Sequence, residues 1–173
     1  ESKRGLQEQR VELVNGFFLE STINLSGGEA LVRLGVEGLR WQKKMFGVRP
    51  RFAWTIDVCG THDQMAQIST GLGLEAMVYT RKNPTGSAVH WSVSPDGTKV
   101  LTLSPGHYSE FGPVMMAKAP LTAAQTAEVE KYLAGKLKIT PEGAPILVLA
   151  GGGDYALAPL RKEFPREFLA EWK

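Results

Sequence analysis

The sequence has little of several features that would assign a protein class directly. It contains one cysteine, Cys59, which excludes an internal disulfide and leaves the cellular compartment open. No apolar run approaches the roughly 18–20 residues needed to cross a bilayer, and no signal-peptide pattern opens the chain. The formal net charge is only +2, with acidic and basic residues interspersed, so neither nucleic acid nor a membrane surface is predicted as a partner.

Signatures of common enzyme sites are also missing. Glycines 151–153 follow an apolar run, but they lack the lysine of a phosphate-binding loop and the spacing of a dinucleotide fingerprint. Cys59 and His62 lie close in sequence with no third group to orient them, so Cys59 is interpreted as a small buried residue and not as a nucleophile. The three histidines show no metal-ligand spacing: His62, His90 and His107.

The chain does have the composition of a globular domain and the alternating order of strands and helices that is typical of an α/β fold. Its 173 residues, 43% hydrophobic and 22% charged, are enough for one domain with a sizeable core. An apolar run at 51–57 ends on Asp57, Thr61 or Asp63 then caps a predicted helix, and a second apolar strand follows at 76–79. This strand–helix–strand order predicts a βαβ unit with parallel strands.

Before this unit, the sequence predicts one strand and one long helix. Residues 11–14 alternate apolar and polar side chains before a turn, which indicates a strand. Ser26 and Glu29 form the pattern of a capping box, and the helix that follows is expected to end at Gly47. Gly35 and Gly38, inside this helix, are expected to allow close packing of the helix on a sheet, and Trp41 is expected in the core.

After the unit, the pattern predicts a hairpin and then a return to α/β order. Runs at 89–93 and 99–103 are joined by a turn-forming sequence at 94–98, which indicates two antiparallel strands. Thr122 is expected to cap a helix, and the fully apolar run at 146–149 is expected to be a further buried strand.

Carboxylates stand at the ends of two of these predicted strands. Asp57 follows the first apolar strand, and Asp154 follows the last one, each beside glycines that allow a ligand to approach the backbone. A pair of carboxylates suits hydrolysis of a glycosidic bond, although each residue could equally end a strand and cap the next helix. Glu20, within an aromatic run, is either a functional acid or a solvated loop residue.

Five segments, taken together and in order, resemble the N-terminal catalytic domain of glycoside hydrolase family 38, the α-mannosidases. Each segment is weak alone, but their order makes the resemblance specific, and it covers nearly the whole chain. The segments are residues 14–20 (VNGFFLE), 44–50 (KMFGVRP), 54–60 (WTIDVCG), 95–101 (PDGTKVL) and 152–155 (GGDY). The resemblance implies an α/β fold that is part of a (β/α)7 barrel with parallel strands and an inserted β-hairpin.

The resemblance also implies roles for individual residues. Asp57 matches the family's nucleophile, which also ligates the active-site Zn²⁺, and Asp154 matches the general acid/base. Glu20 falls in the segment that lines the sugar site, and Phe18 and Tyr155 are assigned with it to substrate binding. The family is retaining, so the two carboxylates are expected to face one cleft roughly 5–6 Å apart.

Departures from the family pattern affect the metal site most. The family's H-x-D zinc motif is absent and its histidine ligand is expected beyond the end of the chain, so Asp57 is the one matched ligand. The aromatic residue after the nucleophile is replaced by Cys59, and the family's tryptophan by Phe18. The chain also starts at Glu and not at Met. Residues 1–173 are therefore interpreted as a fragment of a larger catalytic domain, nearly inactive alone.

The resemblance implies a mannoside substrate and, as a further partner, the rest of the same polypeptide; homo-oligomerisation is left open. Two other functions remain under consideration. One is a degenerate barrel that binds carbohydrate or a partner without catalysis, as the replacements at Cys59 and Phe18 would allow. The other is a metal-dependent carbohydrate deacetylase, which would require a His-x₃-His pair that the chain lacks.

Overall fold

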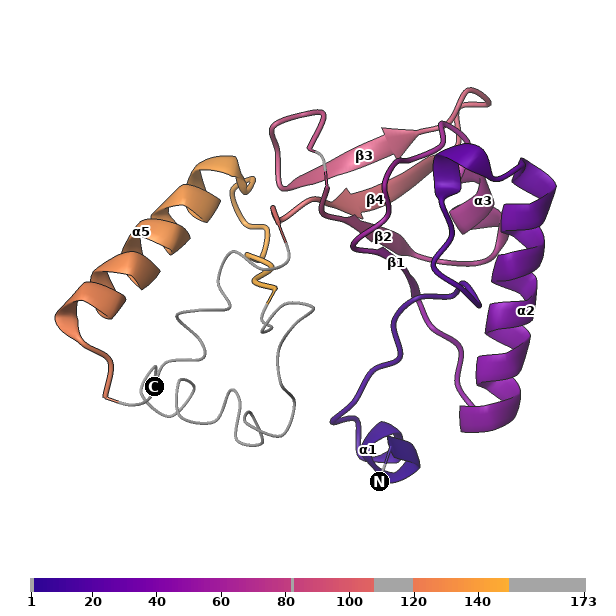
Figure 1. Ribbon diagram of the computed structural model, residues 1–173, viewed down its shortest axis with the longest axis horizontal. Helices are drawn as coiled ribbons and strands as arrows, with labels where there is room; N and C mark the ends of the chain where they lie inside the picture. The colour runs from indigo at the N-terminus through magenta and orange to yellow at the C-terminus, as the bar shows by residue number, and fades with distance from the viewer. Residues whose placement is uncertain (1, 82, 108–119, 150–173) are drawn as a thin grey trace. The chain divides into compact units, whose positions relative to one another are not determined.

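The computed structural model describes residues 2–81, 83–107 and 120–149, and the chain divides into two compact units. The first unit comprises Glu1–Lys82 and Val89–Ser104, and contains a mixed β-sheet with its helices (Figure 1). The second comprises Asn83–Ala88 and Pro105–Lys173, and its described part contains one long helix. Each unit is described separately below.

The first unit is built on a four-stranded sheet with the order β1-β2-β4-β3. Its strands are β1 (Phe52–Thr55), β2 (Ala76–Tyr79), β3 (Val89–Val93) and β4 (Lys99–Leu103). Strands β1, β2 and β4 are parallel, and β3 is antiparallel to β4. The predicted α/β class with mainly parallel strands is therefore confirmed, and the predicted hairpin forms one edge of this same sheet.

Burial of the strands follows their position in the sheet. All four residues of β2, one of the two central strands, are buried, as expected for a parallel strand covered on both faces. On the edge strand β3, Trp91 and Val93 are exposed. The hairpin turn is closed by two backbone hydrogen bonds of 2.9 Å, from Ser94 N to Thr98 O and from Gly97 N to Ser94 O.

Helices α2 (Gly28–Phe46) and α3 (Met65–Gly71) accompany this sheet, with α3 against β3 and β4 and in contact with α2. The predicted caps at their N-termini are wrong. The N-cap of α2 is Gly27, and Ser26 donates its hydroxyl to Thr22 O instead, because a 3₁₀ turn at Ile23–Leu25 precedes the helix. Helix α3 begins after Gln64, with no side-chain cap. The left-handed end of α2 at Gly47 is confirmed.

The core of the first unit lies between the sheet and these helices. It contains residues from α2, α3, the strands and the loops around them: Phe17, Ile23, Leu31, Leu39, Ala53, Val58, Met65, Ala66, Ile68, Leu72, Leu74, Met77, Tyr79 and Val100. A short helix, α1 (Ser2–Gln7), precedes it in sequence. The strand predicted at 11–14 is not formed; these residues are irregular and pair with no strand.

The described part of the second unit centres on helix α5 (Ala123–Ile139). Thr122 caps it as predicted, in a capping box with Gln125. The strand predicted at 146–149 is wrong: these residues are irregular, and Val148 packs against Val129 of α5. An apolar run of four residues does not specify strand pairing, and here all four residues are only half-buried.

The described helices include none that is both long and apolar enough to cross a membrane.

Candidate active site

Asp57 lies just beyond the C-terminal end of β1, in a bend at residues 56–57. Hydroxyl groups fix the ends of β1 and β2 to one another on either side of this point. Thr55 Oγ1 donates to Val78 O at 2.7 Å, and Thr80 Oγ1 donates to Ile56 O. A carboxylate follows β1 as predicted, but β1 is an edge strand buried only at alternate residues and is not the fully buried strand that was expected.

Arg81 is the charged partner of Asp57. Its Nη2 atom faces Asp57 Oδ1 in an ion pair whose geometry is not that of a directed hydrogen bond. The two side chains are half-buried, with 40% exposure for Arg81 and 35% for Asp57. The pair places a positive charge against the carboxyl group at the end of the strand.

Sequence reasoning missed Arg81, although a signal for it was present. Strands β1 and β2 are parallel and in register, with Phe52 opposite Ala76 and Thr55 opposite Tyr79. Extending this register by two residues brings Asp57 opposite Arg81. The pair could have been found by aligning the two predicted strands, once they were taken to be neighbours.

Tyr79 and Cys59 complete the surroundings of the pair. Burial raises the pKa of the Tyr79 phenol, while nearby Arg81 lowers it and Cys59 raises it, and burial is the largest of these effects. The phenol is therefore neutral near pH 7. Cys59 is exposed, so its interpretation as a buried residue is wrong. His62 accepts a hydrogen bond from Gln64 N at its Nδ1 atom (3.1 Å), a local turn contact and not a contact to the thiol.

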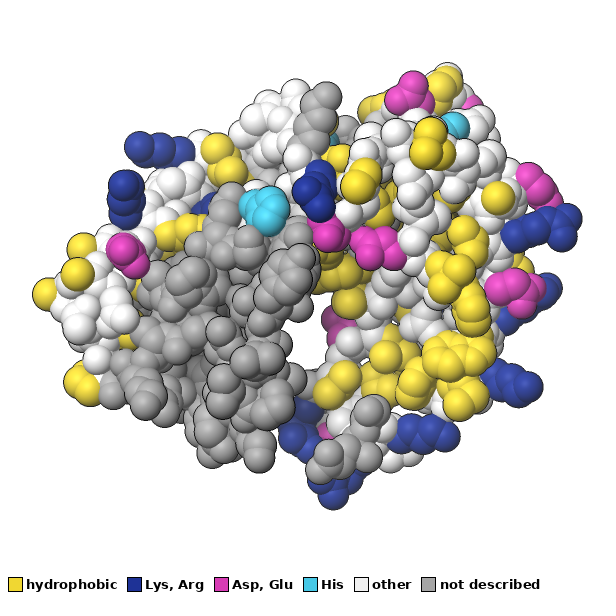
Figure 2. Space-filling view, viewed as in Figure 1, with side chains coloured by type: hydrophobic (Ala, Val, Ile, Leu, Met, Phe, Trp, Pro, Cys, Tyr) yellow, Lys and Arg dark blue, Asp and Glu magenta, His cyan; other side chains and the backbone are white. Residues whose placement is uncertain are grey.

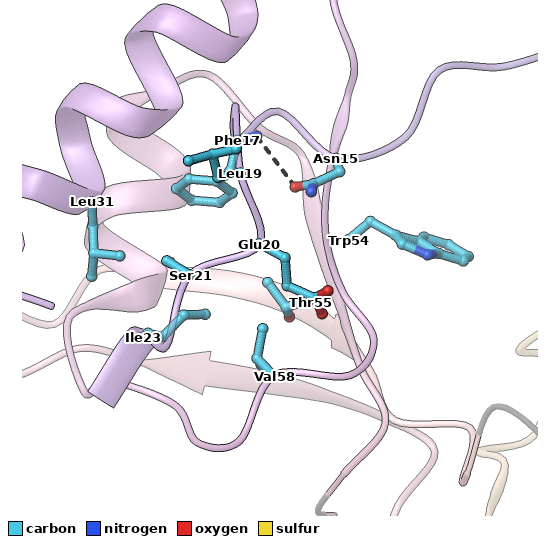
Figure 3. A pocket seen from close by; sticks show the side chains of 10 residues that line it. All are labelled: Asn15, Phe17, Leu19, Glu20, Ser21, Ile23, Leu31, Trp54, Thr55 and Val58. Atoms are coloured by element: carbon cyan, nitrogen blue, oxygen red, sulfur yellow. Dashed lines mark hydrogen bonds between the residues drawn. The ribbon is translucent and has the colours of Figure 1, made fainter. Parts of the chain in front are cut away.

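A small pocket lies beside this strand end, between β1 and the segment that precedes α2. Its cavity volume is only about 10 Å³, far below the ~300–1,000 Å³ typical of ligand sites. Figure 3 shows Glu20 extending toward Thr55 within it, while the ring of Trp54 points away. Its lining comprises Asn15, Phe17, Leu19, Glu20, Ser21, Ile23, Leu31, Trp54, Thr55 and Val58.

The backbone that carries Glu20 is fixed by contacts with α2. Phe18 N donates to Leu34 O at 3.0 Å, and Gln42 Nε2 donates to Asn15 O at 2.9 Å. Asn15 has a positive φ of 70°, and its Oδ1 atom accepts from Phe17 N, which turns the chain into the pocket. Predicted site residue Glu20 therefore lines the same pocket as Thr55, two residues before Asp57.

Phe18 has a different place from Glu20. It faces helix α2, where its ring makes an edge-to-face contact with Trp41 at 6.2 Å between centroids. Both rings are about half exposed, so the expected core position of Trp41 is wrong. They line an open groove with Ala30, Arg33, Leu34 and Glu37. Hydrophobic side chains gather over α2 and the segment before it in Figure 2.

The described residues do not by themselves form a zinc site. No group of three or more His, Cys, Asp or Glu side chains among them could hold a metal ion. Asp57 is the one expected ligand present, and its Oδ1 atom already faces Arg81. The other two predicted site residues, Asp154 and Tyr155, lie outside the described residues.

Comparison with known proteins assigns the family. Residues 2–163 match the glycosyl hydrolases family 38 N-terminal domain. The chain belongs to this family. Membership in this family agrees with the resemblance carried by the five sequence segments. It does not support the alternative function, a metal-dependent carbohydrate deacetylase.

Three individual proteins are similar to the chain. An α-mannosidase of Saccharomyces cerevisiae is 30% identical over 161 residues, which are 86% of this chain and 13% of the yeast protein. The structure of an α-mannosidase from Enterococcus faecalis V583 matches with a TM-score of 0.69 at 19% identity, over 87% of this chain and 17% of that one. A second E. faecalis structure, of a protein in glycosyl hydrolase family 38, matches with a TM-score of 0.56 at 20% identity, over 95% and 18%.

These relatives are much longer than the chain. The chain spans less than one-fifth of the length of each of the three. The two structures share its fold.

Proposed function

We propose that this chain is part of a retaining glycoside hydrolase that acts on α-mannosides, with Asp57 as the nucleophile. The observation that carries the proposal is the position of Asp57, within the family-matched residues, just beyond the end of a parallel strand and beside the pocket that contains Glu20. The ends of parallel strands are the usual place of active sites in α/β folds.

The proposed reaction has two steps. In the first, a carboxylate oxygen of Asp57 forms a bond to the anomeric carbon, the glycosidic C–O bond breaks, and Asp154 transfers its proton to the leaving oxygen. In the second, Asp154 accepts a proton from water, the water oxygen bonds to the anomeric carbon, and the Asp57 carboxylate leaves. Both inversions occur at the same carbon, so the configuration of the sugar is retained.

Three residues would contact the substrate: Glu20, Phe18 and Tyr155. Glu20 lines the pocket beside Asp57, and its carboxylate suits hydrogen bonds to sugar hydroxyls. The pocket is small for a ligand site, and the relatives are far longer than this chain. We therefore assign the rest of the substrate site to other parts of the polypeptide, with the described sheet as part of a (β/α)7 barrel and residues 1–173 as a fragment of the catalytic domain.

We propose that zinc binds only in the complete active site of the full-length protein. When bound, it would supply a Lewis acid for the sugar hydroxyls. The described residues offer one ligand, which does not make a site, because zinc requires three or four. No step above is assigned to the metal. Elemental analysis of the full-length protein tests this part: about one zinc per chain, reduced in Asp57→Asn, is expected, and the same content in both proteins would exclude Asp57 as a ligand.

Hydrolysis of 4-nitrophenyl α-mannoside by the full-length protein tests the function. We expect turnover in the wild type, a loss of about 10³-fold or more in Asp57→Asn, and near-normal turnover in Asp63→Asn, which removes an exposed carboxylate nearby. NMR of the first-formed sugar should show the α-anomer. Turnover of Asp57→Asn within a few-fold of wild type would exclude Asp57 as the nucleophile. Mannoside binding without any turnover in the wild type would favour the non-catalytic alternative.

A further inference from the structure

A groove lined by positive charge lies between helices α2 and α3, and we call it the basic groove. Its cavity volume is about 500 Å³, within the ~300–1,000 Å³ typical of ligand sites. Its lining comprises Val36, Leu39, Arg40, Lys43, Lys44, Arg49, Gly71 and Leu72. The charged side chains among these described residues are all cationic, so the groove has the charge that an anionic ligand requires.

The chain order places the basic groove away from the candidate active site. Arg49 precedes β1, and Leu72 precedes β2. Because β1 and β2 are parallel, both residues lie at the edge of the sheet where these strands begin. Asp57 lies beyond the opposite edge, where β1 ends. A ligand in the groove would therefore leave the surroundings of Asp57 free.

The floor of the basic groove is apolar and closely packed. A Cβ atom on Gly35 would lie 2.2 Å from Cδ1 of Leu72, so α2 meets the residue after α3 here and not the sheet that was expected. Leu39 and Leu72 are buried, whereas the four cationic residues are exposed. An apolar floor with a charged rim suits a ligand that has both an uncharged part and an anionic group.

Stabilisation of the helix ends accounts for only part of this positive charge. Cations are generally favourable near helix C-termini. Lys43 donates from Nζ to Gly47 O at 2.7 Å, and Arg49 donates from Nη2 to Leu72 O at 2.9 Å. These bonds use one donor of each side chain, although an ammonium has three N–H donors and a guanidinium five. Lys44 forms neither a hydrogen bond nor an ion pair within the described part of the chain.

One acidic residue lies beside the groove, and it pairs with one of the four cations. Glu37 accepts a hydrogen bond from Arg40 at 3.0 Å, and their side chains are 63% and 73% exposed. Exposed pairs of this kind contribute little free energy, so Arg40 can turn toward a ligand at small cost. The charges of Lys43, Lys44 and Arg49 are not neutralised by this pair.

We propose that the basic groove binds a phosphate-bearing small molecule. Arg40 and Lys44 are one turn of α2 apart, a rise of about 6 Å, so the cations surround a compact anion and not an extended polymer. Phosphate oxygens accept charge-assisted hydrogen bonds, and the planar guanidinium of arginine matches their geometry. The proposal is independent of the proposed function, because no residue of the groove takes part in the two proposed steps.

Calorimetric titration of the full-length protein with pyrophosphate at low ionic strength tests the proposal. Arg40→Gln and Arg33→Gln are a matched pair, because both arginines are exposed on α2 and contact a glutamate, but Arg33 is outside the basic groove. We expect Arg40→Gln and Lys44→Gln each to weaken pyrophosphate binding by about 5–10-fold. Arg33→Gln should bind as the wild type does, and added salt should weaken binding to the wild type.

Two further measurements identify the site and the class of ligand. Asp57→Asn should bind pyrophosphate as the wild type does, and loss of binding in this variant would place the ligand at the candidate active site and overturn the proposal. A glutamate-rich peptide should bind more weakly than pyrophosphate. Stronger binding of the peptide would replace the small ligand by an acidic protein segment. No pyrophosphate binding by the wild type, or equal losses in Arg40→Gln and Arg33→Gln, would also overturn the proposal.

Discussion

A Cβ atom placed on Gly38 would lie 2.3 Å from the carbonyl oxygen of Gly16. It would also lie 2.5 Å from Phe18 N, the group that donates a hydrogen bond to Leu34 O. Helix α2 and the segment that carries Glu20 therefore meet through their backbones, which requires a residue without a side chain. Gly38 is therefore a site of close packing, but the expected partner is wrong: the helix meets this segment here and not the sheet.

Gly38→Ala should accordingly destabilise the protein by about 1–3 kcal/mol, because the neighbouring backbone has to move. Gly135→Ala is the matched control, since Gly135 is also inside a helix but has no atom within 4 Å of the added Cβ. It should stabilise by about 0.5–1 kcal/mol through helix propensity alone. Chemical denaturation measures both, and a stabilised Gly38→Ala would contradict the contact.

Thr55→Val tests the contact between the strand ends. The substitution keeps the shape of the buried side chain but removes the hydrogen bond to Val78 O, so we expect a loss of about 0.5–1.5 kcal/mol. Thr70→Val is the control, because its longer 3.4 Å contact to Lys99 O lies at an exposed position. Urea unfolding compares the two, and equal effects would show that the Thr55 hydroxyl contributes nothing specific.

The pair of Arg51 and Glu75 predicts a pH-dependent contribution to stability. The hydrogen bond from Arg51 is the main cause that lowers the pKa of Glu75 below its ordinary value of 4.5. A depressed carboxyl pKa stabilises the folded state above the unfolded-state pKa, and this contribution is lost as the pH falls through the folded-state value. Glu75→Gln should therefore lower the urea midpoint at pH 7 and have no effect at a pH below both values.

Two controls test the origin of that effect. In an Arg51→Met background, Glu75→Gln should no longer change stability with pH, because the partner charge is gone. High salt should reduce the effect in the wild type, since both side chains are exposed. A difference that persists at acidic pH would mean that Glu75 acts through packing and not through its charge.

Cys59 provides a chemical probe beside Asp57. It is exposed and is the only cysteine of the chain, so native protein should react with a thiol reagent at this residue without denaturant. Under the proposed function, Cys59→Ser should keep turnover, because no step uses a thiol. A bulky maleimide on wild-type Cys59 should reduce turnover by obstructing the site, and Cys59→Ser should be resistant. Loss of activity in Cys59→Ser itself would contradict the proposed step assignment.

Element positions were predicted best where local pattern and tertiary packing agree. The strands at 76–79, 89–93 and 99–103 are confirmed with the expected bounds, because each is an apolar or alternating run beside turn-forming residues. The predicted strands at 11–14 and 146–149 failed, because a strand also requires a partner, and short runs do not identify one. Of these two runs, the one at 146–149 packs in part against a helix, because Val148 contacts Val129 of α5.

Predictions of helix N-caps were limited in the same way, because a local sequence pattern does not show which contacts the side chain makes. The patterns at Ser26 and Thr122 both satisfy the sequence rule for an N-cap, but only Thr122 makes the cap contact. Ser26 already donates to Thr22 within the preceding 3₁₀ turn, which sequence reasoning did not predict. A local signal fails when a neighbouring turn engages the same hydroxyl.

The sequence by itself determined that a carboxylate follows a strand, since the apolar run of β1, the acid Asp57 and the glycine at position 60 are all local features. It also carried the family pattern. Only the tertiary structure decided what surrounds that carboxylate: Arg81 comes opposite Asp57 because β1 and β2 pair in parallel and in register, and Glu20 comes beside Thr55 because Gly38 allows its segment to pack on α2. Pairing and close approach depend on residues far apart in the chain, and a local pattern does not contain them.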